Sequence, residues 1–429
     1  MAKHTALGFG AGALLRVLAA ILAGTLLLAL AYSIPTEYIE PNAEKSALTV
    51  KEEGLNPSVT KHVSCVIDNW TDSTMLLEAI YPCSGNAFRD SMLACRFGSG
   101  SDIPRDVLWQ YFETGEYSGT TPYPQYWHGY LVLLKPLLLV TDYAGIRVIN
   151  GVVQALVTAL VCLALWRKGQ RRYIVPYLLC ILLLIPVALA KCLQYSSCFY
   201  IFSLGSLAVI LTGGGEGGKR RLLLLIFLYI GIATAYFDYL TYPVAVFGIP
   251  ALFYVNMTPA RRPRETLKRF FAALAVWGFG YGAMWLGKFV VGSLITGENM
   301  FAAAMDHVGY WMSDANSFTV PFVLIKNLKI FSRTPAMAAA LLYAAALFAL
   351  LLARRKRLTG EDRAALPRLV LPYAVLGVLP FIWYIVMLNP SGVHYELFGH
   401  KALVVTAFAG LSMLTKLYEL TKKPALAQS

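Results

Sequence analysis

Charged residues are scarce in this chain of 429 residues, since Asp, Glu, Lys and Arg together make up only 14% of it. Hydrophobic residues make up 57%, and the mean hydropathy is +0.58. A single soluble domain cannot hide so much apolar surface from water, so this composition indicates a membrane protein with many spans. The formal charge of +13 does not indicate nucleic acid as a partner, because the basic residues stand in short clusters between apolar runs.

Residue spacings that are typical of metal sites are also missing. None of the seven cysteines belongs to a C-x-x-C pair, and no His/Cys pair stands at a ligand spacing, so the sequence indicates neither a metal site nor a cofactor. One disulfide is compatible with the five cysteines predicted on one side of the membrane, and its pairing stays open: Cys65, Cys83, Cys95, Cys192 and Cys198.

Ten apolar runs have at least about 16 residues, close to the length that a membrane-crossing helix needs. They cover approximately residues 11–32, 144–166, 173–190, 195–212, 222–237, 239–257, 270–292, 336–353, 369–388 and 402–418. The first run is longer than the apolar core of a secretory signal and lacks a clean small-residue cleavage site, so we expect it to be retained. The predicted fold class is therefore an all-α polytopic membrane protein.

Basic residues are distributed unevenly between the loops. Four alternate loops between residues 167 and 368 carry 4, 3, 5 and 6 Lys and Arg residues, whereas the short turns at 191–194, 238–242 and 389–401 carry 1, 0 and 1. This asymmetry predicts a cytoplasmic N-terminus. The predicted parts are a first span (1–32), a first outer loop with juxtamembrane helices (33–143), six spans (144–292), a second outer loop (293–335), and three spans with a cytoplasmic tail (336–429).

One further apolar run, 126–140, is not counted as a span. It has only 15 residues, is interrupted by Lys135 and Pro136, and would move the basic cluster at 167–172 to the outside if it crossed the membrane. We expect an interfacial or re-entrant helix there.

The rest of the first outer loop is predicted to form a small helical cap. Residues 35–61 are polar and are interpreted as a connector. One helix is expected to start after Asp72 and to stop near Pro82, and a second to run from Asp102 as N-cap to Gly115.

Two carboxyl groups lie four residues apart in the segment IDNWTDSTMLLEAI at 67–80, namely Asp68 and Asp72. On one helix they would share a face, and their mutual repulsion would raise the pKa of one of them. Two interpretations of Asp72 stay open. It is the N-cap of a helix that begins at Ser73, or it is a general base presented at the start of that helix.

Other ionisable side chains fall at the predicted outer ends of the spans, and they include His128, Asp238, His307, His394, Glu396, His400 and Lys401. Acids, imidazoles and a lone lysine at a lipid–water boundary suit a reaction on a phosphate-bearing lipid. Asp238, in AYFDYLTYP at 235–243, is either part of that reaction or a turn residue before the next helix. The segment NPSGVHYELFGHK at 389–401 either binds a phosphate or anchors the interface through its Lys and Tyr.

The stretch TPYPQYWHGYLVLLKPLLLVTDYAGIRVINGVVQAL at 121–156 resembles a segment of the GT-C type polytopic glycosyltransferases, in the branch of the protein O-mannosyltransferases and the aminoarabinose lipid A transferases. Tyr126 and Trp127 match the aromatic pair of that segment, and Arg147 matches its arginine. Pro122-Tyr-Pro124 stands where the family has two adjacent prolines. Asp68 and Asp72 are the nearest match to the acidic pair of the family. TDSTML, FDYLTYP and the 389–401 segment are similar to motifs in uncharacterised Gram-positive membrane proteins of this superfamily.

The resemblance implies a GT-C-like fold and an inverting transfer of a sugar from a polyprenyl-phosphate donor, on the outer face of a bacterial cytoplasmic membrane. The acceptor would be a glycan, lipid or protein of the cell envelope, and membrane lipids would be further partners. Asp72 would be the base and Asp68 its helper. The other implied roles are phosphate binding by His394, His400 and Lys401, sugar stacking by Trp70 and Trp127, and substrate binding by His128, Arg147, Asp238 and Tyr395. That branch generally needs no metal for the chemistry, although more distant members of the type use one.

Two other functions stay open. A flippase, ligase or polymerase of lipid-linked oligosaccharides would also handle a phosphate-bearing lipid, but flippases concentrate polar groups at midplane rather than in a long loop after the first span. A non-enzymatic assembly or transport protein is the third reading. It gains no support from an internal repeat, and acids are nearly absent from the middle of the spans.

Overall fold

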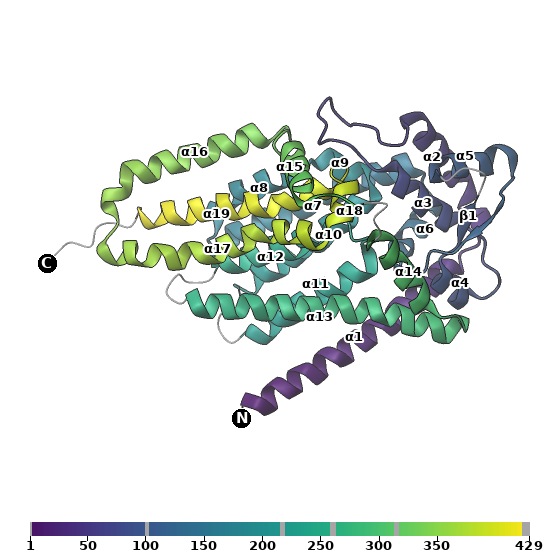
Figure 1. Ribbon diagram of the computed structural model, residues 1–429, viewed down its shortest axis with the longest axis horizontal. Helices are drawn as coiled ribbons and strands as arrows, with labels where there is room; N and C mark the ends of the chain where they lie inside the picture. The colour runs from purple at the N-terminus through teal and green to yellow at the C-terminus, as the bar shows by residue number, and fades with distance from the viewer. Residues whose placement is uncertain (1, 99–102, 215–218, 258–262, 313–316, 423–429) are drawn as a thin grey trace.

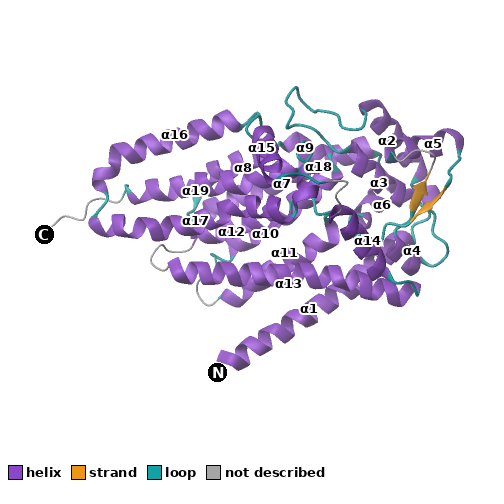
Figure 2. Cartoon of the chain, in the orientation of Figure 1, coloured by secondary structure: helices purple, strands orange, loops and turns teal. Residues whose placement is uncertain are grey.

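The computed structural model describes residues 2–98, 103–214, 219–257, 263–312 and 317–422. Helices dominate this part of the chain, and its only strands are β1 (Arg96–Gly98) and β2 (Gly119–Thr121), which form an antiparallel pair (Figure 2). Eight described helices contain segments that are long and apolar enough to cross a membrane. They are α1 (Ala2–Tyr32), α7 (Tyr143–Arg167), α10 (Leu193–Leu211), α11 (Arg220–Phe237), α13 (Pro263–Thr296), α16 (Met337–Arg354), α17 (Gly360–Val386) and α19 (Val404–Leu420). The expected all-α class with several membrane-length helices is thus confirmed.

Two of the ten predicted spans do not form membrane-length helices. The run at 173–190 is divided into α8 (Ile174–Leu183) and α9 (Pro186–Lys191), and the break falls at Ile185, which has a φ of 63°. Pro186 explains the break, because proline has no N–H to donate and disfavours helical geometry in the residue before it. The run at 239–257 gives α12 (Pro243–Met257), which has only 15 residues.

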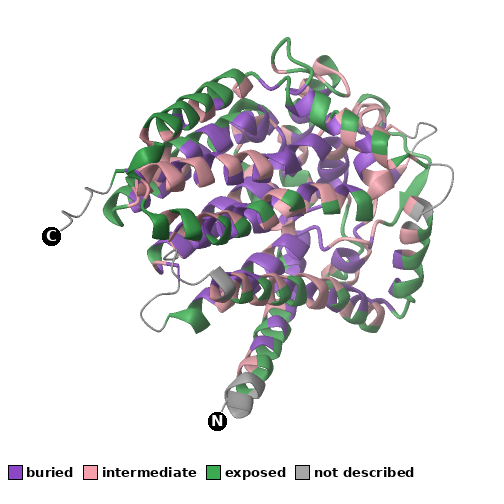
Figure 3. Ribbon diagram, turned by 60° about the vertical axis from the view of Figure 1, so that its left-hand side comes forward, coloured by how far each residue is buried: buried purple, intermediate pink, exposed green. Residues whose placement is uncertain are grey.

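Many bundle helices leave apolar side chains uncovered, as Figure 3 shows by the green outer faces of the ribbons. Leu22 of α1 is 64% exposed, Leu294 of α13 is 81% exposed and Leu342 of α16 is 71% exposed. In water such surfaces would favour aggregation, whereas hydrocarbon chains solvate them without cost. Small residues bring the inner helices close: a Cβ on Gly231 of α11 would lie 2.2 Å from the carbonyl oxygen of Trp277 on α13.

A cap of short elements lies at one end of the bundle, on the right in Figure 1, and we call this the cap end. It contains α2 (Glu40–Glu53), α3 (Asn69–Ile80), α4 (Ala87–Leu93), β1, α5 (Pro104–Thr114), β2 and α6 (Leu131–Val140), besides the single turn η1 (Thr36–Tyr38). The helix α16 ends at the opposite end of the bundle and is followed directly by the basic turn η4 (Arg355–Arg357). The basic turn η2 (Arg171–Tyr173) lies near the end of α19, because Nη1 of Arg172 is 4.0 Å from the Glu419 carboxylate.

Three sequence expectations for the cap need correction or refinement. The segment 35–61 is not merely a connector, because it contains the 14-residue helix α2. The next helix, α3, begins at Asn69 and not after Asp72. The helix expected from Asp102 to Gly115 is α5, whose N-cap position is Ile103 and whose C-cap is Gly115 with a φ of 68°; Asp102 lies outside the described residues.

The run at 126–140 forms α6, whose 10 residues are too short to cross a bilayer. The segment 293–335 contains α14 (Met300–Met312) and α15 (Val320–Phe331), and α18 (Leu388–Val393) with the turn η5 (Gly399–Leu403) leads into α19. All seven cysteines lie in the described ranges and carry free thiols, so the disulfide that the sequence allowed is not formed. The side chain of His307 lies outside the described residues.

Candidate functional site

The N-terminal turn of α3 separates the roles of its two carboxyl groups. Asp68 is the N-cap: its side chain accepts hydrogen bonds from the backbone N–H of Thr71 at 3.1 Å and from the Thr71 hydroxyl at 2.8 Å. Asp72 lies one turn further, inside the helix. The interpretation of Asp72 as the N-cap is therefore wrong, because the chain enters the helix four residues earlier than its sequence suggested.

Asp72 is fully buried where the cap meets the bundle, and all its hydrogen-bond donors come from other elements. The Tyr143 hydroxyl at the start of α7 donates to it, and so do the backbone N–H groups of Leu193 at 3.0 Å and Gln194 at 3.3 Å. The Cys192 thiol donates at 3.5 Å. The carboxyl group thus faces the N-terminus of α10, where the unpaired N–H groups of the first turn favour negative charge.

The pKa of Asp72 is raised to about 7. Burial is the largest cause of the rise and the nearby Asp68 adds to it, whereas the N–H groups of Leu193 and Gln194 and the charge of Arg147 oppose it. Burial also raises the pKa of Asp68. Among the described residues, no cation lies within ion-pair distance of Asp72. A carboxyl group in this state is about half ionised near neutral pH, which is the condition that suits proton transfer.

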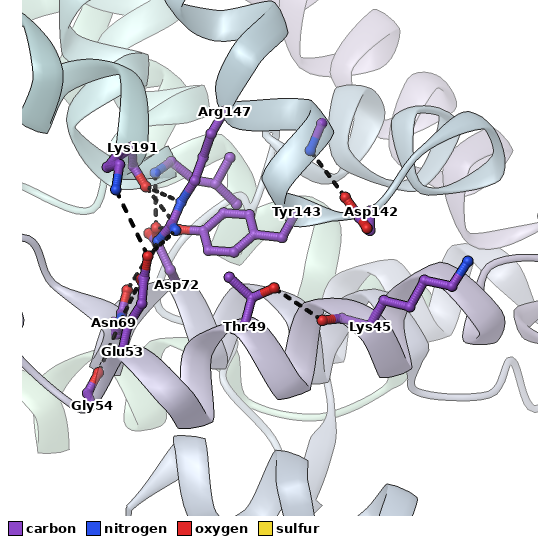
Figure 4. Close-up of polar contacts among 12 residues, drawn as sticks. Lys45, Thr49, Glu53, Gly54, Asn69, Asp72, Asp142, Tyr143, Arg147 and Lys191 are labelled. Atoms are coloured by element: carbon purple, nitrogen blue, oxygen red, sulfur yellow. Dashed lines mark hydrogen bonds and ion pairs between the residues drawn. The ribbon is translucent and has the colours of Figure 1, made fainter.

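Arg147 forms a bidentate ion pair beside the acids, with Nη1 at 2.6 Å from Oε1 of Glu53 and Nη2 at 2.8 Å from Oε2. Its Nε donates to the carbonyl oxygen of Lys191 at 2.8 Å. Figure 4 shows these groups converging with Tyr143 and Asp72 at the junction of α2, α3 and α7. Arg147 therefore ties the cap to the bundle, and it is only 7% exposed.

Glu53 is a residue that the sequence interpretation missed, because it lies in the segment taken for a connector. Burial by itself would raise the pKa of Glu53, but the hydrogen bonds and charge of Arg147 hold it below its ordinary value. Ala43, Ala47 and Val50 of α2 are all buried. Their helical spacing was the available signal for a helix that ends at Glu53.

Tyr195 of α10 connects the 389–401 segment with the chain just before Asp68. The Tyr195 hydroxyl donates to the carbonyl oxygen of Leu397 at 3.0 Å and is 3.5 Å from that of Val66, two residues before Asp68. Lys401 is fully buried with its Nζ 4.9 Å from the centroid of the Tyr195 ring. We name Asp68, Asp72, Cys192, Tyr195 and Lys401 the Asp72 site.

The ammonium group of Lys401 has no hydrogen-bond partner within the described ranges. It lies near the thiols of Cys192 and Cys65, and the Cys192 thiol in turn contacts Asp72. Burial raises the pKa of Cys192 well above that of an ordinary thiol, and the nearby Asp72 raises it further, so the thiol stays neutral. A buried cation without a partner costs free energy. The arrangement can therefore receive an anion beside Lys401 and a proton at Asp72.

The two histidines predicted to bind phosphate do not present a positive charge at this site. The ring of His394 stacks on Phe398 with centroids 4.6 Å apart, and burial lowers the pKa of His394 to about 4, so the ring is neutral at pH 7. Nδ1 of His400 lies 2.9 Å from the carbonyl oxygen of Tyr395. Tyr395 itself is half-buried, with the Lys326 ammonium 5.5 Å from its ring centroid.

A second buried polar group, which we call the Glu78 cluster, lies further along α3 and consists of Glu78, His128, Tyr130 and Tyr239. Oε2 of Glu78 lies 3.0 Å from Nδ1 of His128 and 3.3 Å from the Tyr239 hydroxyl, and the Tyr130 hydroxyl donates to it. His128 thus belongs to a different cluster from Asp72. Glu78 was not among the residues singled out in the sequence.

The two predicted stacking residues lie in opposite environments. Trp70 is 41% exposed on the first turn of α3, whereas Trp127 is fully buried and donates its indole N–H to the carbonyl oxygen of Met284 at 2.7 Å. Trp127 therefore offers no free ring face to a sugar. Asp238 accepts hydrogen bonds from the backbone N–H of Thr241 at 3.1 Å and from the Cys198 thiol at 3.3 Å, in the turn before α12. Burial raises the pKa of Asp238.

No group of three or more His, Cys, Asp or Glu side chains that could hold a metal ion occurs in the part of the chain that the structure describes. Comparisons with protein-family models, with curated proteins and with solved structures gave no match to the chain.

Proposed function

We propose that this protein is a membrane-embedded glycosyltransferase that moves a sugar, with inversion, from a polyprenyl-phosphate donor to an acceptor of the cell envelope. The strongest support is that a buried carboxyl group, Asp72, and the unpartnered ammonium of Lys401 lie on either side of Cys192 at the cap end of an apolar bundle, with Asp68 one turn before Asp72. Glycosyl transfer from a lipid phosphate needs both groups: a base for the acceptor and a cation for the departing phosphate.

In the proposed reaction the acceptor hydroxyl oxygen forms a bond to the anomeric carbon while the bond from that carbon to the phosphate oxygen breaks. Asp72 takes the hydroxyl proton, and the bonding electrons leave with the phosphate, whose added charge Lys401 stabilises. Asp68 orients the first turn of α3 through Thr71. Since the pKa of Asp72 is about 7, the carboxylate is available at neutral pH without being a weak base.

Access to this site requires an opening, because Asp72 and Lys401 are both fully covered. The contacts that close it are the bonds of Tyr195 with Leu397 and Val66, which join the 389–401 segment to the first loop. We propose that the donor enters by separating these two segments. Closure around the bound substrate would then exclude water, which suits transfer to an acceptor in place of hydrolysis.

We further propose that the protein resides in a bacterial cytoplasmic membrane with its N-terminus in the cytoplasm and the cap outside. The basic turns η2 and η4 lie at the end of the bundle opposite the cap, which agrees with the positive-inside rule. Single cysteines introduced at Lys168 and at Glu113 should react with an impermeant thiol reagent from opposite sides. Labelling of the Lys168 position from outside intact cells would reverse the orientation.

The proposed activity is tested by reconstituting the purified chain in liposomes with a radiolabelled polyprenyl-phosphate sugar and a membrane extract as acceptor. Asp72→Asn should lower transfer by about 100-fold or more, the range that general bases contribute. Asp106→Asn is the matched control, because Asp106 pairs with its neighbour Arg105 on the surface of the cap. Equal transfer by the wild type and Asp72→Asn would rule out Asp72 as the base.

A further inference from the structure

A groove of about 550 Å³ opens at the cap end between the first loop and the turn that precedes α16. Its lining residues come from two segments only: Lys61, His62 and Val63 on one side, and Ser332, Arg333, Thr334, Pro335, Met337, Ala338 and Leu341 on the other. Neither segment contributes a carboxylate. The groove is therefore a basic recess at the start of a membrane-length helix.

Three basic side chains, Lys61, His62 and Arg333, line the groove, and all three residues are exposed. No ion pair joins Lys61 or Arg333 to a carboxylate within the described ranges. Their charges are thus uncompensated by the protein and available to an anion. Basic residues near a bilayer surface attract anionic headgroups.

The opposite wall of the groove is apolar and continues along α16. Met337, Ala338 and Leu341 form this wall, and Leu341 is 61% exposed. Only 11% of the most apolar stretch of α16 is buried inside the protein. A ligand that fits both walls carries a phosphate at one end and a hydrocarbon chain at the other. A free phosphate would satisfy the basic wall alone.

The turn between the two walls is held in place from inside the protein. The Ser64 hydroxyl donates to the carbonyl oxygen of Arg333 at 3.4 Å, and the Thr334 hydroxyl donates to that of Phe331 at 2.9 Å. Ser64 is buried, so this contact fixes Arg333 next to the first loop. The recess is consequently built from two segments that are distant in the sequence and joined by a partly buried hydrogen bond.

We propose that this groove binds one membrane lipid with an anionic phosphate headgroup, whose phosphate lies between Lys61 and Arg333 and whose chain lies along α16. This lipid site does not depend on the glycosyltransferase activity. It uses none of the residues of the Asp72 site, and the buried residues Ser64 and Cys65 separate it from Lys401.

The test measures lipids retained by the detergent-purified full chain, using native mass spectrometry with phosphatidylglycerol and phosphatidylcholine as probes. The wild type should retain one phosphatidylglycerol in preference to phosphatidylcholine. The double variant Lys61→Glu/Arg333→Glu should weaken that binding by about tenfold or more, because two attractive charges become repulsive. The control Lys45→Glu/Lys168→Glu makes the same charge change at two exposed positions away from the groove and should bind as the wild type does.

A second experiment tests whether the groove binds a whole lipid or only a phosphate. Leu341→Asn should weaken phosphatidylglycerol binding and leave competition by inorganic phosphate unchanged. Equal phosphatidylglycerol binding by the groove variant and the wild type would overturn the proposal. Equal phosphatidylglycerol binding by Leu341→Asn and the wild type would overturn it too, because a site for phosphate alone does not use the apolar wall. If the Glu variant fails to fold by circular dichroism, Lys61→Gln/Arg333→Gln carries the same test with a smaller expected loss.

Discussion

Two buried carboxyl groups lie on the same helix, α3, and differ in what surrounds them. Oε2 of Glu78 lies 3.0 Å from an imidazole nitrogen and contacts two tyrosine hydroxyls, all inside its own cluster. Asp72 receives only dipoles: a tyrosine hydroxyl, a thiol and two backbone N–H groups. The unpaired cation of its site, Lys401, lies beyond the Cys192 thiol.

From this difference we expect the Glu78 cluster to stabilise the fold and the Asp72 site to take part in the proposed reaction. Oε2 of Glu78 contacts an imidazole and two tyrosine hydroxyls and so joins three segments, and removing it leaves these groups without their common partner. Asp72 has no direct ion-pair partner among the described residues, and the buried ammonium of Lys401, which lacks a hydrogen-bond partner, carries a cost that a bound anion would relieve. Such stored costs gather at functional sites. We therefore expect Glu78 to stabilise the fold and Asp72 to act in the proposed transfer.

The largest effect on stability is expected at Glu78. Glu78→Leu keeps the volume but leaves His128, Tyr130 and Tyr239 without their common acceptor, so the free energy of unfolding should fall by about 3 kcal/mol or more. Thermal unfolding in detergent measures it. A Glu78→Leu variant that is as stable as the wild type would contradict the structural role of Glu78, because the cluster would then contribute nothing to stability.

Lys401→Met should keep its stability and lose transfer activity. It replaces a buried ammonium that lacks a partner with an apolar side chain of similar length, so stability should stay equal or rise by about 1 kcal/mol. Transfer should nevertheless fall by about tenfold or more, because the departing phosphate loses its cation. The two readouts are the thermal midpoint and the transfer rate; a variant with lower stability and unchanged transfer would make Lys401 a structural residue.

The smallest effect is expected from Tyr143→Phe, which removes one hydrogen bond to the Asp72 carboxylate. Because that bond favours the ionised form, the pKa of Asp72 should rise by about one unit or less, and the acid limb of the transfer profile should move to higher pH. A matched control is Tyr200→Phe, whose hydroxyl bonds Asn150 instead. An acid limb that does not move would show that Asp72 is not the group titrating in it.

Asp72 also makes stability depend on pH. Its folded pKa, about 7, lies above its ordinary value of 3.8, so between these values the folded chain binds a proton that the unfolded chain has released. Stability should therefore fall as the pH rises through this window and stay level above it. Relative to Asp72→Asn, the wild type should lose thermal stability between about pH 4 and about pH 7.

The sequence predicted the elements whose signals are local. Long apolar runs become the eight membrane-length helices, and Gly115 ends α5 because its φ of 68° suits glycine. The start of α3 was misplaced because Asp68 and Asp72 are both good N-caps four residues apart, and only the tertiary contacts of Asp72 decide between them. The helix α2 was missed because its polar residues outnumber the buried Ala43, Ala47 and Val50.

The site itself was predictable only in part. The acids of the first loop and Lys401 were identified from their residue types, but no local pattern indicates that Tyr195 and Cys192 lie between them. Burial also changes what a residue type can do: His394 is neutral at pH 7, and Trp127 offers no free face. Trp127, for example, bonds to Met284, which is 157 residues away, and such long-range packing leaves no local pattern in the sequence.

The most direct test of the account is the pH dependence of sugar transfer in liposomes, for the wild type and Asp72→Asn at equal protein folding. A base must be ionised to act, so wild-type transfer should fall as the pH is lowered through about 7 and should level off above it. Asp72→Asn should retain only weak transfer without that limb. A wild-type profile that is flat across neutral pH, or an identical limb in Asp72→Asn, would contradict the assignment of Asp72 as the base.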